Sequence, residues 1–292
     1  MSRREIPANI KTRRHFIYVG AAKCATTWLF EVLRNHPEIF VPASKDTEFF
    51  GRHYGRGTDW YNSFFRNAQA HQMTGEICHR YFSNPDACKH IQEIQSLTKI
   101  LIGLRSPVDR LVSAYAYDRS NFLSAKIDFL TYCRRPEVRE QSDYLNNAAR
   151  FLRNFPQDQV RVFFFEDIRR DAENTLRGLE EFLEVSVRDA YPNVDRKVWS
   201  ARRPRSVALA HLAYSVAMKM RGRGLYSLPG RLRSSSFVET ALFRAERESF
   251  VIPNDQLVEM FGYYRRSYTR LEEIIGRPLP PEWHELPGTE KT

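Results

Sequence analysis

A lysine and two threonines follow a short apolar run near the start of the chain. Residues 16–20 favour a strand, and Lys23, Thr26 and Thr27 come just after it. Apolar residues then recur at helical spacing, beginning at Trp28. The backbone N–H groups and the dipole of a helix N-terminus attract an anion, and a lysine with two hydroxyls adds charge and donors. The stretch therefore predicts a strand, a tight loop and a helix, with a phosphate-type ligand bound at the loop.

The whole loop is a candidate phosphate site, because small residues let a phosphate approach the backbone closely. It comprises Gly20, Ala21, Ala22, Lys23, Cys24, Ala25, Thr26, Thr27 and Trp28. The nucleotide P-loop does not fit, because that motif has a glycine and a lysine directly before Ser or Thr. Here Lys23 stands three residues before Thr26, and no glycine lies between Gly20 and Thr27.

A second candidate phosphate site follows another strand. Residues 99–104 form an apolar run that is typical of a buried parallel strand, and Arg105 comes directly after it. Pro107 suits the first turn of a helix that carries Ser113. Arginine offers a planar fork of donors to a phosphate, and open α/β sheets bind ligands at the carboxyl ends of their strands. Arg105 and Ser113 are therefore candidates for binding a second phosphate.

The two motifs together resemble those of sulfotransferases that use 3′-phosphoadenosine-5′-phosphosulfate (PAPS). The first is similar to the family's 5′-phosphosulfate loop, Lys-x-Gly-Thr-Thr-Trp, but has Ala25 where the family has Gly, which raises the cost of a positive φ. The second is similar to the family's 3′-phosphate motif, whose Arg and Ser match Arg105 and Ser113. The resemblance implies transfer from PAPS with release of adenosine 3′,5′-bisphosphate (PAP). It also implies that Lys23 stabilises the bridging oxygen and that Trp28 stacks on adenine.

Three side chains are candidates for the base that removes the acceptor's proton. Residues 45–50 are similar to the Lys-Glu-x-x-Phe-Phe element of carbohydrate-type sulfotransferases, in which Asp46 replaces the catalytic Glu and Glu48 lies two residues on. Residues 75–82 are similar to Gly-Glu-x-x-Pro-x-Tyr, and their His79 matches by offset the base of cytosolic sulfotransferases. Histidine titrates near neutrality, whereas a carboxylate is a weak base unless it is buried. We therefore rank His79 first, Asp46 second and Glu48 third.

The order of elements predicts an α/β fold with a P-loop-like parallel sheet flanked by helices in a single domain. Strands are expected near residues 16–20, 38–41, 73–77, 99–104 and 160–165. The domain is expected to comprise a core with the cofactor motifs (14–195), a basic loop and helical lid or acceptor region (196–250), and a C-terminal helix (251–292). By resemblance, Arg202 or Arg203 closes over the 3′-phosphate. A solvated basic loop and a plain surface insertion are the alternatives for this middle part.

The net charge and the cysteines limit the classes of partner and cofactor that the protein can be expected to bind. The 292 residues carry a formal net charge of +10, which suits a polyanionic cofactor but also nucleic acid. The cationic residues are dispersed and no nucleic-acid-binding module is recognisable, so no nucleic-acid partner is expected. The resemblance to sulfotransferases implies a small-molecule or glycan acceptor. The four cysteines have no metal-type pairing, and no metal is expected. A P-loop-like kinase or ATPase and a basic nucleic-acid-binding protein are the competing hypotheses.

The N-terminal residues 1–14 are basic and contain no apolar core of the kind found in signal peptides or anchors. Golgi sulfotransferases carry a membrane anchor ahead of the catalytic domain. We therefore expect no membrane span and a soluble, cytoplasmic enzyme of bacterial type, with its cysteines reduced.

Overall fold

The computed structural model describes residues 10–43, 45–94, 98–121, 127–191 and 251–286, together with residues 194, 203–204, 216 and 243–244. Its centre is a five-stranded sheet in the order β2-β3-β1-β4-β5, with every neighbouring pair parallel. The strands are β1 (His15–Gly20), β2 (Ile39–Phe40), β3 (Met73–Ile77), β4 (Thr98–Leu104) and β5 (Val160–Phe164). All five strands expected from the sequence are confirmed, and so is the α/β class with a P-loop-like parallel sheet.

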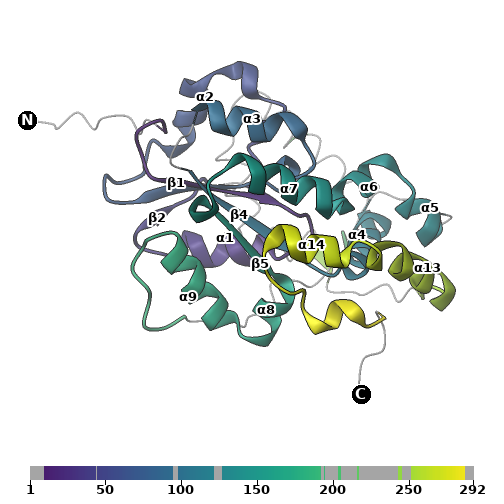
Figure 1. The fold of residues 1–292 in the computed structure, drawn as a ribbon. Coiled ribbons are helices and arrows are strands. Elements are labelled where there is room, and N and C mark those ends of the chain that lie inside the picture. The colour runs from purple at the N-terminus through teal and green to yellow at the C-terminus, as the bar shows by residue number, and fades with distance from the viewer. Residues whose placement is uncertain are drawn as a thin grey trace, which may run out of the picture.

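Helices cover both faces of this sheet (Figure 1). On one face lie α1 (Thr26–Arg34), α8 (Phe165–Arg170) and α9 (Ala172–Phe182). The other face is covered by α2 (Thr58–Asn62), α3 (Pro85–Ile94), α4 (Pro107–Asn121), α5 (Phe129–Cys133), α6 (Pro136–Ser142), α7 (Tyr144–Asn154), α13 (Asn254–Arg265) and α14 (Tyr268–Ile275). Side chains of a strand alternate between the faces, so Ile17 and Val19 enter one core while Phe16 and Tyr18 enter the other.

Both candidate phosphate motifs lie where a strand passes into a helix. β1 leads through the loop into α1, whose Trp28, Leu29 and Leu33 are buried against the sheet. β4 leads into α4, which begins at Pro107 as the sequence predicts. Because β1 and β4 are adjacent and parallel, the two motifs come together at the carboxyl end of the sheet.

The C-terminal residues form two helices, so the single C-terminal helix expected within residues 251–292 is wrong. α13 and α14 are separated at Ser267, whose amide and hydroxyl both donate to the Tyr264 carbonyl, at 3.0 and 2.7 Å. A serine that hydrogen-bonds a nearby carbonyl offers the backbone an alternative to a continuous helix. Gly276, in the left-handed conformation at φ 69°, ends α14 as expected. Both helices contribute side chains to the core of the sheet.

Most of the predicted basic loop and helical region (196–250) lies outside the described residues, including Arg202 and the helical pattern over residues 207–220. The described part is an antiparallel pair, β6 (Arg203–Pro204) with β7 (Phe243–Arg244), and β6 lies beside α4. The division of the chain into these three parts stays a prediction. Within the ranges given above, no helix is both long and apolar enough to cross a membrane.

Candidate active site

The loop between β1 and α1 is fixed by hydrogen bonds to its carbonyl and amide groups. The Tyr18 hydroxyl donates to the carbonyls of Ala21 and Cys24, at 2.8 and 3.1 Å. The Ala21 amide donates to the Gly103 carbonyl in β4 at 2.7 Å. A Cβ on Gly103 would lie 2.8 Å from the Tyr18 hydroxyl, so the glycine makes room for it. The sequence predicts Tyr18 only as a strand residue. The one sequence signal that Tyr18 also supports the loop is a hydroxyl group within an apolar run.

Three loop residues have a backbone conformation that favours glycine, namely Gly20, Ala25 and Lys23, the last with φ 65°. Gly20 has φ 143°, and a Cβ there would collide with the side chain of Phe82. Ala25 has φ 62° and precedes α1, at the position where the resembling motif has Gly. No side chain caps α1 in the described structure, so the amides of its first turn are directed at the loop. This arrangement fits an anion held by backbone N–H groups.

Lys23 lies among several charged groups. Its Nζ is 4.2 Å from the centroid of the exposed Tyr117 ring. Burial lowers the pKa of Lys23 to about 8. The carboxylate of Asp118 opposes this shift, whereas the cations of Arg105 and Lys45 add to it. The lysine of the first motif is therefore close enough to the arginine of the second to feel its charge, and an anionic ligand would relieve the repulsion between them.

Arg105 is half-buried at the end of β4 with part of its guanidinium unsatisfied. The Cζ atom lies 4.4 Å from the centroid of the Phe165 ring, and the buried Nε has no hydrogen-bond partner in the described structure. A buried donor without a partner costs free energy that an acceptor oxygen would recover. Ser113 is half-buried further along α4. These residues therefore fit a phosphate group.

Asp46 and His79, expected as rival bases, form one pair. His79 Nδ1 lies 3.1 Å from Asp46 Oδ1. Burial acts to raise the pKa of Asp46, but the hydrogen bond from His79 and the charges of His79, Lys45 and Arg80 together outweigh it, so this pKa lies below its ordinary value. Asp46 is therefore ionised at neutral pH and a poor base. Glu48 lies 3.3 Å from Arg80 (Oε1 to Nε) in a separate ion pair.

Other predicted loop residues have additional neighbours. Ala22 and Thr26 are half-buried and Thr27 is exposed. The Lys45 ammonium donates to the Thr27 hydroxyl at 2.9 Å, which brings a second lysine to the loop. No spacing pattern in the sequence predicts this contact, because the two residues meet only in the folded chain.

Trp28 and Cys24 are packed inside the protein. Trp28 is 1% exposed, and its indole N–H donates to the Val194 carbonyl at 2.9 Å. Its stacking on adenine stays a prediction. Burial raises the pKa of the Cys24 thiol to about 12, so Cys24 fills space and is not a reactive thiolate. Arg203 lies in β6, and its role at the 3′-phosphate also stays a prediction.

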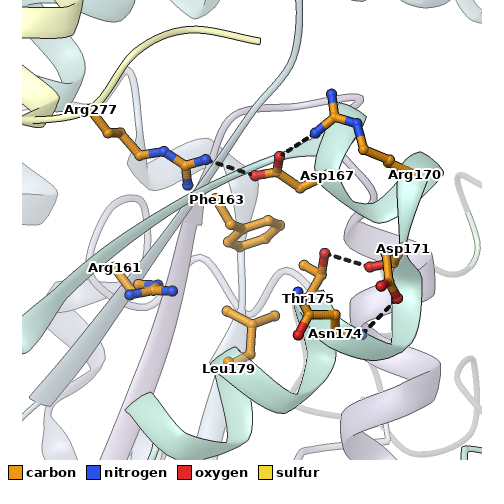
Figure 2. Close-up of a pocket in the computed structure, with 10 residues that line it drawn as sticks. Arg161, Phe163, Asp167, Arg170, Asp171, Asn174, Thr175, Leu179 and Arg277 are labelled. Carbon is orange, nitrogen blue, oxygen red and sulfur yellow. Dashed lines mark hydrogen bonds and ion pairs between the residues drawn. The ribbon is translucent and has the colours of Figure 1, made fainter.

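A pocket of about 280 Å³ lies beside β5, away from these residues (Figure 2). It is lined by Arg161, Phe163, Asp167, Arg170, Asp171, Asn174, Thr175, Gly178, Leu179 and Arg277. Asp167 lies between Arg170 and Arg277, at 3.5 and 3.2 Å. Asp167 also accepts the Phe164 amide at 3.4 Å and so caps the start of α8. The pocket contains none of the predicted site residues. No group of three or more possible metal ligands occurs in the part of the chain that the structure describes.

The sequence profile of the sulfotransferase domain matches residues 13–222, so the chain belongs to the sulfotransferase family. Human heparan sulfate glucosamine 3-O-sulfotransferase 5 is 28% identical over 192 residues, which are 61% of this chain and 55% of that protein. The membrane-associated sulfotransferase kil1 of Dictyostelium discoideum is 27% identical over 139 residues, 47% of this chain and 30% of its own length. The chain thus spans 55% of the length of the first relative and 30% of the length of the second.

A solved sulfotransferase from Alicyclobacillus acidocaldarius has the same fold, with a TM-score of 0.64 and 24% identity. The match covers 94% of this chain and all of that structure. Family membership supports sulfuryl transfer as the general reaction, in place of the phosphoryl transfer of a kinase or ATPase.

Proposed function

We propose that this protein transfers the sulfuryl group of PAPS to a hydroxyl or amine of a small-molecule or glycan acceptor and releases PAP. The observation that carries the choice of donor is the meeting of two phosphate motifs at adjacent strand ends. Lys23 and the uncapped α1 follow β1, and Arg105 with its unsatisfied Nε follows β4. A nucleotide with both a 5′- and a 3′-phosphate offers one anion to each.

In the proposed reaction the acceptor oxygen or nitrogen attacks sulfur while the bond between sulfur and the bridging phosphate oxygen breaks. Negative charge develops on that bridging oxygen, where the Lys23 ammonium stabilises it. The amides at the start of α1 and the hydroxyls of Thr26 and Thr27 hold the 5′-phosphate. By analogy with phosphoryl transfer, positioning and electrostatics supply most of the rate enhancement.

His79 accepts the acceptor's proton in this proposal, and Asp46 assists it. Asp46 binds Nδ1 of the imidazole, so Nε2 is the atom that takes the proton. The ionised carboxylate holds the ring in one orientation and stabilises the imidazolium that forms, as the Asp of a Ser-His-Asp triad does. The pairing keeps the ranking of His79 first and gives Asp46 a supporting role.

A glycan acceptor is supported by two features. The human relative is named for a glucosamine of heparan sulfate, and residues 45–50 resemble the carbohydrate-type element. The net charge of +10 also suits an acceptor that already carries acidic groups.

PAP is expected to raise the melting temperature of the protein far more than AMP or ATP at equal concentration. Only PAP occupies both phosphate motifs, and a ligand stabilises the folded state by RT ln(1 + [L]/Kd), so the nucleotide that binds more tightly gives the larger shift. Differential scanning fluorimetry checks this, with ATP tested with and without Mg²⁺. Equal shifts with all three nucleotides would contradict PAPS as the donor and favour a general nucleotide site.

His79→Ala is expected to lower kcat by about a hundredfold or more, which is the usual contribution of a general base. PAP affinity should stay unchanged, because the His79 side chain pairs with Asp46 and only the His79 backbone carbonyl lies against the phosphate loop, at Gly20. Steady-state kinetics at saturating PAPS, with PAP titrations in parallel, measure both. The matched control is His71→Ala, which removes an exposed histidine from a turn. If His79→Ala keeps normal turnover while Asp46→Asn does not, the roles of the pair are the reverse of those proposed.

A further inference from the structure

Glu76 is a deeply buried carboxylate whose partners are neutral donors. It lies in β3 and is 1% exposed. Its Oε1 accepts the Thr47 amide at 3.2 Å, the Thr47 hydroxyl, and the Tyr81 hydroxyl at 3.0 Å. Its Oε2 accepts the Tyr61 hydroxyl at 2.7 Å. A buried carboxylate is costly unless it is fully hydrogen-bonded, and these four donors occupy both of its oxygens.

Thr47 is the central residue of a strained turn. Its neighbours Asp46 and Glu48 have φ values of 60° and 54°, in the left-handed region that residues with a side chain avoid. Such a conformation persists only where surrounding contacts over-determine it. Two contacts from β3 do so here, because the Asp46 amide donates to the Ile77 carbonyl at 2.9 Å and Glu76 holds Thr47 by both its amide and its hydroxyl.

β3 also leads directly to His79. The 3₁₀-helix η3 (His79–Tyr81) begins two residues after β3 ends, so Glu76 joins the turn that bears Asp46 to the segment that bears its partner. The distance of 3.1 Å between Asp46 Oδ1 and His79 Nδ1 depends on how these two segments are held together. We propose that Glu76 is a positioning residue that acts through Thr47 to hold Asp46 against His79. The proposal rests on the proposed function in one respect, since that function is what makes Asp46 and His79 a catalytic pair.

The two oxygens of Glu76 separate a positioning role from a purely structural one. Oε1 binds Thr47, within the turn. Oε2 binds Tyr61, whose hydroxyl lies 3.1 Å from His15 Nε2 and so continues the network into the core. The Tyr61 ring stacks on Phe49, with centroids 4.5 Å apart, and Tyr61→Phe keeps this contact while it removes the hydroxyl. Both hydroxyls belong to buried residues and both donate to the same carboxylate. Only Thr47 is covalently linked to Asp46.

Two matched variants test the proposal, since Thr47→Val and Tyr61→Phe each remove one hydroxyl from Glu76. Both are expected to lower the melting temperature. Thr47→Val should in addition lower kcat by about ten- to a hundredfold, because a small displacement of a catalytic group is that costly. The KM for PAPS should not change. Tyr61→Phe should keep kcat within about twofold of the wild type, since surface and core changes away from a site leave its chemistry intact. Thr47→Ser keeps the hydroxyl that Thr47→Val lacks and should keep most of the wild-type kcat.

Equal losses of kcat in Thr47→Val and Tyr61→Phe, or no recovery in Thr47→Ser, would overturn the positioning role and leave Glu76 as a stabilising residue. Hydrogen exchange of residues 45–50 gives a second readout that needs no donor or acceptor. Exchange should be faster in Thr47→Val and unchanged in Tyr61→Phe. Unchanged exchange in Thr47→Val would overturn the proposal. If the exchange pattern is as expected but the protein transfers no sulfuryl group from PAPS, the role of Glu76 in holding the turn is supported. The proposed function is then the part that is contradicted.

Discussion

Lys23→Ala is expected to lower kcat by about 10²- to 10³-fold, the usual effect of removing one preorganised group that stabilises developing charge. PAP affinity should fall much less, because the charge on the bridging oxygen builds up in the transition state and is smaller in the bound ground state. Steady-state kinetics with PAPS and calorimetric titration with PAP measure the two effects separately. The matched control is Lys89→Ala. Lys89 lies on α3 with its side chain 75% exposed, so this substitution removes the same charge outside the candidate site.

The pKa of Lys23 supplies a further check on this prediction. Because burial lowers it to about 8, the free protein loses the ammonium charge as the pH rises through 8. A bound anion favours the protonated form, so PAP binding near pH 8 should take up a proton, and PAP affinity should fall above that pH. Calorimetry in two buffers of different ionisation enthalpy detects the uptake, which Lys23→Ala should abolish. Near-normal kcat with only a raised KM would make Lys23 a binding residue rather than a catalytic one.

Arg105→Ala is expected to weaken PAP binding by about a hundredfold, which corresponds to the loss of a charge-assisted, two-pronged contact with phosphate. Affinity for adenosine 5′-phosphosulfate should hardly change, because that nucleotide has no 3′-phosphate. The PAP affinity of Arg105→Lys should lie between those of the wild type and Arg105→Ala, since lysine keeps the charge and loses the planar fork. Calorimetric titrations of both nucleotides measure the preference.

Arg161→Ala is the matched control for Arg105. Arg161 is an exposed arginine on β5, the strand next to the one that Arg105 follows, and it lines the separate pocket of Figure 2. Its loss should leave both affinities unchanged. An Arg105→Ala protein that still prefers PAP over adenosine 5′-phosphosulfate would place the 3′-phosphate elsewhere.

The parts of the fold that the sequence predicts well are those fixed by neighbouring residues. β1, β4 and β5 are largely apolar runs, α4 begins at Pro107, and α14 ends at Gly276, each for a reason that lies within a few residues of chain. The break between α13 and α14 escaped prediction, because the apolar spacing continues across Ser267 while its hydroxyl binds the preceding turn.

The site was harder to predict, because its decisive contacts join segments that are distant in sequence. Residue types and spacing identify Lys23, Arg105, Asp46 and His79 as candidates. The sequence treats Asp46 and His79 as alternatives, since their contact exists only once β3 and the turn before it are assembled. The support that Tyr18 gives to the phosphate loop escaped prediction for the same reason.

The left-handed backbone at Ala25 bears on how such proteins are found. A methyl group is tolerated there at a cost of about 1–2 kcal/mol, which a folded domain can absorb. Alanine therefore adopts at this position a conformation that glycine reaches at less cost. A search pattern that insists on glycine before the two threonines would discard this chain. Genomes screened with a backbone-aware pattern, open to alanine at that point, should therefore yield members that a literal motif overlooks.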